Sequence, residues 1–120
     1  MRCIVNCSND LQNLHEHTGC IKYLRVPVDD SEDGHWPMLP YFEATNSFIE
    51  EALASDKCVL VHCLAGVSRS PTIVIAYLMG CKGLCLAQAM SLVQAKRGII
   101  QPNKYFMEQL QQYEQQLLTP

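Results

Sequence analysis

The chain has 120 residues, of which 48% are hydrophobic and 18% are charged, and its formal net charge is −3. This length suits one domain with one core, and the composition is that of a folded rather than a disordered chain. The acidic balance and the lack of any basic run argue against a nucleic-acid-binding protein. We therefore expect a single domain over residues 1–120, with no nucleic-acid partner.

The sequence also bears on location and redox chemistry. It has no apolar stretch long enough to span a membrane, and residues 1–10 lack the features of a signal peptide. We expect a cytoplasmic or nuclear protein, whose seven cysteines are mostly buried free thiols. The pairs Cys3/Cys7 and Cys81/Cys85 have three residues between their members, whereas zinc knuckles favour a tighter C-x2-C turn. We expect no metal site.

Short strand-like runs and longer helical patterns alternate along the chain. In chain order we expect a strand at 3–7, a strand at 21–28, a polar loop at 29–37, a helix at 39–56, a strand at 58–62, and helices at 71–80, 86–98 and 103–118. Strands separated by helices predict an α/β fold, in which a central, mostly parallel sheet is flanked by helices in a three-layer sandwich.

Individual residues sharpen these boundaries. The run CVLVH (58–62) is continuously apolar, which is typical of a central strand covered on both faces. Pro71 suits the first turn of the helix that follows, and Gly80 suits its end. Asn103 can cap the last helix.

The stretch VHCLAGVSRS (61–70) carries the strongest chemical signal, because it joins an apolar strand to an apolar helix. Ligands of α/β sheets bind beyond the carboxyl ends of the strands. A loop that enters a helix there presents backbone N–H groups and the positive end of the helix dipole, and Gly66 permits a close backbone approach. The same potential lowers the pKa of a cysteine, so we expect Cys63 to be a thiolate.

Arg69 completes an anion site with Cys63, because it lies six residues further on and can hold two oxygens of an oxyanion. A nucleophilic thiolate in an anion cradle with an arginine is suited to attack a phosphorus atom. Phosphoryl transfer also requires a proton for the leaving oxygen, and this donor must come from elsewhere in the chain.

The motif H-C-x5-R-S, from His62 to Ser70, resembles the signature of the cysteine-based protein tyrosine phosphatases. The longer strings VLVHCLAGVSRSPTIVIAYLM and AKRGIIQPNKYFMEQLQQYE are similar to the dual-specificity branch, and the likeness covers most of the chain. The resemblance implies a phosphatase-type three-layer fold and a hydrolase that acts on phosphotyrosine and on phosphoserine or phosphothreonine.

The resemblance also implies a role for each residue of the motif. Cys63 would be the nucleophile that forms a phosphocysteine intermediate, and Arg69 would bind the phosphate and the transition state. His62 would orient the loop and tune the thiol, and Ser70 would stabilise the departing thiolate. The backbone N–H groups of the anion cradle would be those of Leu64, Ala65, Gly66, Val67, Ser68 and Arg69.

In this family the general acid is an aspartate on an upstream loop. The stretch RVPVDD matches the family's pattern there and places Asp30 at the acid position. Asp29 and Asp33 remain alternatives, because the polar stretch is slightly longer than usual. Asn103 has two interpretations, a family position near the site and a simple helix cap.

The family's catalytic domain usually begins well before the strand IVNC, so we expect a sheet-edge strand and a recognition helix to be missing. The exposed edge would promote self-association. The expected partners are phosphorylated proteins, and the chemistry requires no metal or organic cofactor. Two alternatives remain. One is a phosphoprotein-binding module with weak turnover, and the other is a phosphatase for lipid or RNA phosphates. The second is disfavoured because Leu64, Ala65 and Val67 supply no basic side chain.

Overall fold

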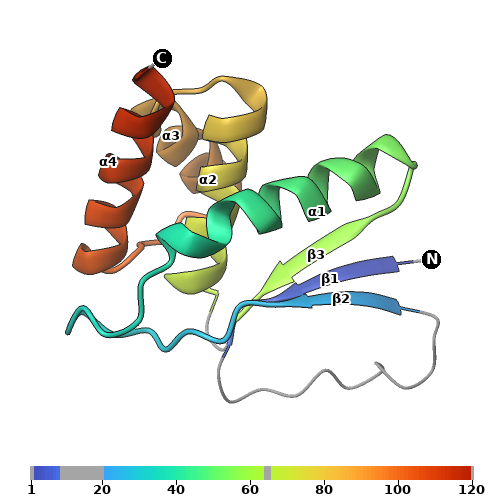
Figure 1. The fold of residues 1–120 in the computed structure, drawn as a ribbon, viewed down its shortest axis with the longest axis horizontal. Coiled ribbons are helices and arrows are strands. Elements are labelled where there is room, and N and C mark those ends of the chain that lie inside the picture. Colours follow the sequence, from blue (N-terminus) through green and yellow to red (C-terminus); the bar gives the residue numbers. More distant parts are fainter. Residues whose placement is uncertain (1, 9–20, 64–65, 120) are drawn as a thin grey trace.

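A computed structural model describes residues 2–8, 21–63 and 66–119 of the chain. The described elements, in chain order, are β1 (Arg2–Asn6), β2 (Ile21–Arg25), the short 3-10 helix η2 (Leu39–Tyr41), α1 (Phe42–Ala54), β3 (Val59–His62), α2 (Arg69–Lys82), α3 (Leu86–Lys96) and α4 (Lys104–Leu118) (Figure 1). The predicted elements are present, with boundaries that differ by a few residues.

The described strands form a parallel sheet in the order β2-β1-β3, and their arrows in Figure 1 point the same way. Val5 of β1 lies opposite Leu24 on one side and Val61 on the other. Because the strands are parallel, the loops that follow their carboxyl ends leave from one edge of the sheet. This arrangement confirms the predicted α/β fold with a parallel sheet, and it places the start of the 61–70 stretch at the edge where α/β sheets in general bind ligands.

The prediction that 58–62 is the central strand is wrong for the described sheet. β1 holds the centre, because it pairs on both sides, and β3 lies beside it. The side chain of Leu60 is 56% exposed. A continuous apolar run indicates a strand, but it does not state which strand will have two partners.

The expectation of mostly buried thiols holds for only part of the chain. Cys3 lies on β1 and Cys7 directly follows it, and both are buried. Cys58, Cys81 and Cys85 are exposed. These three cysteines lie at or next to the ends of helices and strands. Their neighbours in sequence are partly apolar, but the fold does not bury these positions.

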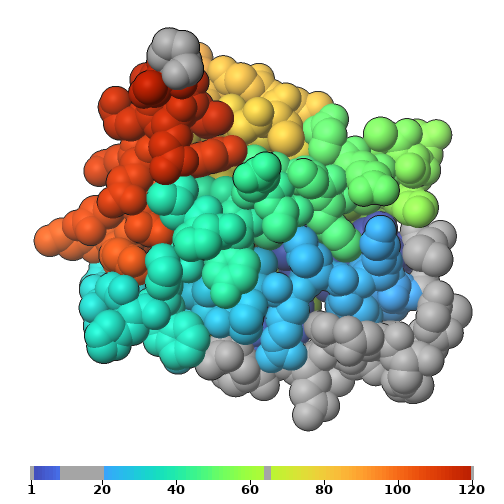
Figure 2. Space-filling view, in the orientation of Figure 1, coloured from blue at the N-terminus to red at the C-terminus, as the bar shows by residue number. Residues whose placement is uncertain are grey.

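Helix α2 is the centre of the helical layer and packs against α1, α3, α4 and β3. Its buried side chains include Ile73, Ile75 and Ala76. On the face that Figure 2 shows, α1 adjoins α4. The ring centroids of Phe42 of α1 and Tyr113 of α4 are 5.0 Å apart. None of the helices in the described part of the chain has the length and apolar character needed to cross a bilayer.

The end of α2 differs from the prediction. Gly80 lies inside the helix, and Gly83 caps it with a left-handed φ of 72°. The N–H of Leu84 then donates to the carbonyl of Leu78 at 3.2 Å, which satisfies a carbonyl of the last turn. Gly80 is needed for another reason, because a Cβ there would collide with the Tyr113 hydroxyl and the Asn46 amide.

Candidate active site

Cys63 directly follows β3, and Arg69 is the first residue of α2, so the strand and the helix set both ends of the intervening loop. We call residues 63–70 the anion loop; Leu64 and Ala65 lie outside the described residues. Gly66 has a φ of +68°, a backbone conformation that favours glycine. The Sγ of Cys63 lies 3.3 Å from the Ser70 hydroxyl, and the Ser70 N–H donates to the same sulfur at 3.3 Å.

These contacts act on the ionisation of the nucleophile candidate. Partial burial favours the neutral thiol of Cys63. Hydrogen bonds from Ser70 and from the Gly66 N–H, together with the charge of Arg69, outweigh it, so the pKa of Cys63 lies below its ordinary value. The site therefore holds more thiolate at neutral pH than a free cysteine would.

Arg69 supplies a cation to the site, and this residue is only 7% exposed. Its Nη1 donates a 3.0 Å hydrogen bond to the carbonyl of Val28, which directly precedes the acidic stretch. A guanidinium carries five N–H donors, so this bond leaves donors for the oxygens of a phosphate. One side chain thus joins the anion loop to the segment that carries the acid candidates.

Asn103 links the acid candidate Asp30 to the anion loop. Its side-chain Nδ2 donates to the Asp30 carboxylate at 2.8 Å and to the Ser31 carbonyl at 3.2 Å. Its backbone N–H donates to the Ser68 hydroxyl at 2.8 Å, and its Oδ1 caps α4 by accepting from the Phe106 N–H at 2.8 Å. The two interpretations of Asn103 were not alternatives, since the residue caps the helix and also lies in the site.

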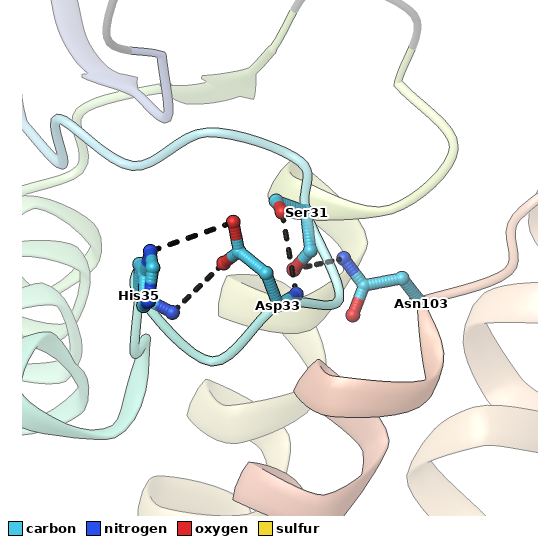
Figure 3. Close-up of polar contacts among 4 residues, drawn as sticks. All are labelled: Ser31, Asp33, His35 and Asn103. Atoms are coloured by element: carbon cyan, nitrogen blue, oxygen red, sulfur yellow. Dashed lines mark hydrogen bonds and ion pairs between the residues drawn. The ribbon is translucent and has the colours of Figure 1, made fainter.

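Asp33 has different partners. Its Oδ1 accepts a 2.8 Å bond from the His35 N–H, its other oxygen lies 3.6 Å from the His35 ring, and its own N–H donates to the Ser31 hydroxyl (Figure 3). The backbone hydrogen bond from His35 is the main reason that the pKa of Asp33 lies below its ordinary value. Asp33 is held within its own exposed loop, whereas Asp30 is held by the residue that also contacts Ser68, so the contacts favour Asp30.

His62 and Cys7 lie next to the nucleophile candidate Cys63. His62 is the last residue of β3, and burial lowers the pKa of its ring, so the neutral imidazole is favoured. Its carbonyl accepts a 2.8 Å bond from the N–H of Cys7, which places Cys7 beside Cys63 at the end of the β1–β3 pair. Burial and the negative charge of Cys63 raise the pKa of Cys7, which is thus a neutral thiol.

Sequence reasoning missed two contacts that attach α4 and the segment before it to the anion loop and to the acidic stretch. The N–H of Gln101 donates to the Val67 carbonyl at 2.6 Å, and the N–H of Lys104 donates to the Glu32 carboxylate at 2.6 Å. The available signal was the string AKRGIIQPNKYF, which resembles a family motif in sequence but does not show which loops it contacts.

Comparison with known proteins gives consistent results. The sequence model of the family described as "Dual specificity phosphatase, catalytic domain" matches residues 1–116. The chain is 43% identical to the dual specificity protein phosphatase Mpk3 of Drosophila melanogaster, over 95% of this chain and 27% of that protein. It therefore spans just over a quarter of the length of that curated relative.

Two solved structures share its fold. Human DUSP28 is 34% identical, with a TM-score of 0.90 that covers 99% of this chain and 78% of that one. A mouse putative dual specificity phosphatase, complexed with zinc tungstate, is 34% identical with a TM-score of 0.87, over 98% of this chain and 71% of that one.

Proposed function

The chain belongs to the dual specificity phosphatase catalytic-domain family, and from that premise we propose that it hydrolyses phosphotyrosine and phosphoserine or phosphothreonine in proteins. One observation carries the proposal: Cys63, Arg69 and Ser70 gather where β3 meets α2, and Asn103 ties the Asp30 carboxylate to the same loop. Family, fold and side-chain geometry support the same chemistry.

In the first step the phosphate of the substrate lies in the anion loop, where backbone N–H groups and the Arg69 guanidinium bind its oxygens. The Cys63 thiolate attacks phosphorus, so that an S–P bond forms as the bond to the substrate oxygen breaks. Asp30 gives its proton to the leaving oxygen, which departs as the free hydroxyl of the protein side chain.

In the second step a water molecule attacks the phosphocysteine. Asp30, now a carboxylate, takes a proton from this water, and the S–P bond breaks to release inorganic phosphate. The electron pair returns to the sulfur of Cys63, where hydrogen bonds from the Ser70 hydroxyl and N–H stabilise the thiolate. The Arg69 charge is in place for both transition states.

The test uses purified, reduced protein and two phosphopeptides with the same flanking sequence, one phosphorylated on tyrosine and one on threonine. We expect phosphate release from both, and none above background with Cys63→Ser, while Cys58→Ser serves as a control because that thiol is exposed and lies at the opposite end of β3 from the loop. Phosphopeptide binding without release by the folded wild type would instead identify a binding module. Faster release from phosphoinositides than from either peptide would identify a lipid phosphatase.

A further inference from the structure

A groove of about 580 Å³ opens between α3, α4 and the segment that joins them. The side chains of its lining that matter here are Val67, Met90, Gln94, Gln101, Lys104 and Met107. We call this surface the flank groove. The flank groove and the anion loop share one residue, Val67, and the rest of the groove's lining lies outside the loop.

The flank groove is attached to the catalytic loops by backbone contacts. Val67 belongs to the anion loop, and its carbonyl accepts the 2.6 Å hydrogen bond from the Gln101 N–H. Asn103, which holds Asp30, also contributes to the lining. Consecutive residues of an extended peptide are about 3.4 Å apart. Because Val67 belongs to both the anion loop and the groove's lining, the groove adjoins the loop in which we propose that the phosphorylated residue binds, and we infer that a side chain one or two residues away reaches it.

The groove's lining mixes polar and apolar side chains, and two methionines supply its apolar part. Met90 of α3 and Met107 of α4 are half-buried and pack against the core, which leaves part of each thioether side chain accessible. Methionine side chains adapt to apolar groups of different shape. The groove thus offers a deformable apolar wall on two helices.

The charges of the lining do not favour a second phosphate. Glu32 contributes one carboxylate, which accepts the N–H of Lys104 at 2.6 Å, and the Lys104 ammonium offsets its charge. Gln94 and Gln101 are uncharged. Arg97 stands outside the lining, with its guanidinium within about 3 Å of where a Cβ of Gly66 would lie.

We propose that the flank groove binds an apolar side chain, such as leucine or methionine, located near the phosphorylated residue of a protein substrate. The inference rests on the proposed function and adds a substrate preference to it. An interaction made equally in the ground state and the transition state lowers KM without changing kcat. The preference will therefore be seen mainly in KM, with an effect of roughly tenfold on kcat/KM for one apolar side chain.

The test uses phosphotyrosine peptides whose other residues are alanine, with leucine or aspartate placed in turn at each of the first two positions on either side. We expect leucine at one or more of these positions to raise kcat/KM about tenfold over alanine, and aspartate not to do so. Met90→Gln and Met107→Gln should each reduce the preference for leucine and leave hydrolysis of a small aryl phosphate unchanged. Leu92→Gln is the matched control, since Leu92 lies exposed on α3 outside the groove's lining.

Three results would overturn the inference: equal kcat/KM for leucine and alanine at every position, a leucine preference that survives both methionine substitutions, or a stronger preference for aspartate. The affinity of the same peptides for Cys63→Ser, measured by fluorescence anisotropy, must show the same ranking without turnover. A wild type that fails to hydrolyse the aryl phosphate would refute the proposed function. The anisotropy ranking would still decide for or against the groove.

Discussion

The two halves of the candidate site are held in place in different ways. In the anion loop, Arg69 and Ser70 are only 7% and 6% exposed, and both belong to a helix packed in the centre of the molecule. Asp30, in contrast, is exposed on an irregular segment, and its carboxylate accepts a hydrogen bond from the side-chain amide of Asn103. Secondary structure positions the candidate nucleophile, whereas a side chain from a distant segment positions the candidate acid. The second half should therefore be easier to disturb without unfolding the protein.

Arg69 belongs to both halves, because it supplies charge to the anion loop and donates to the Val28 carbonyl. We expect Arg69→Lys to lower kcat/KM for an aryl phosphate by about 10²–10³-fold, since an ammonium cannot reproduce the planar donors of a guanidinium. Arg2→Lys, at an exposed position of β1, is the control. A loss smaller than about threefold in steady-state assays would show that Arg69 is not the phosphate ligand.

Replacing the acid tests the exposed half directly. Asp30→Asn should lower kcat about 10²-fold, and the loss should grow as the leaving group becomes more basic, because a poor leaving group needs the proton most. Asp33→Asn should have little effect, since Asp33 bonds within its own loop. Rates measured over a series of substituted phenyl phosphates provide the check. A larger loss for Asp33→Asn would reassign the general acid.

A substitution of Asn103 can distinguish its contact with Asp30 from its capping of α4. Asn103→Ser keeps a hydroxyl that can cap the helix but removes the amide donor to Asp30. We expect roughly a tenfold loss of kcat on phenyl phosphate, a smaller loss on substrates with good leaving groups, and little change in Tm. Equal losses on all leaving groups would mean that the substitution disturbs the anion loop rather than the acid.

Ser70→Ala gives the smallest expected effect in the buried half. The Ser70 hydroxyl helps to hold the pKa of Cys63 below its ordinary value, so its removal moves that pKa upward. The thiolate then forms at higher pH. In a plot of the Cys63 alkylation rate against pH, the rising limb therefore moves to higher pH. Iodoacetamide labelling against pH, with the site identified by mass spectrometry, measures this shift. An unchanged limb, or one displaced to lower pH, would contradict the role of the hydroxyl.

The same difference explains what the sequence could predict. The run from His62 to Ser70 is contiguous, and a strand followed by a helix determines where its ends lie, so the anion loop was predictable from local pattern. Asp30 could be proposed only by resemblance, because its partner Asn103 is 73 positions further along the chain. A pattern of residue types contains no information on which distant loops become neighbours.

The errors in the fold have similar causes. β3 was expected at the centre because its run is continuously apolar, but pairing order depends on all the strands together. Gly80 was expected to end α2, since a helix-ending glycine and one required by a close approach look alike in sequence. The structure distinguishes them through the left-handed φ of Gly83 and the tight contacts around Gly80.

The most direct test of the account is to trap the phosphorylated enzyme. Ser70→Ala, which lacks the hydroxyl that we propose stabilises the departing thiolate, should be mixed with an aryl phosphate, quenched in acid during turnover, and mapped by mass spectrometry. The account predicts a phosphate on the peptide that contains Cys63, and none on that peptide when Cys63→Ser is added. Hydrolysis that proceeds with Cys63 unmodified, or a phosphate found on a different residue, would contradict it.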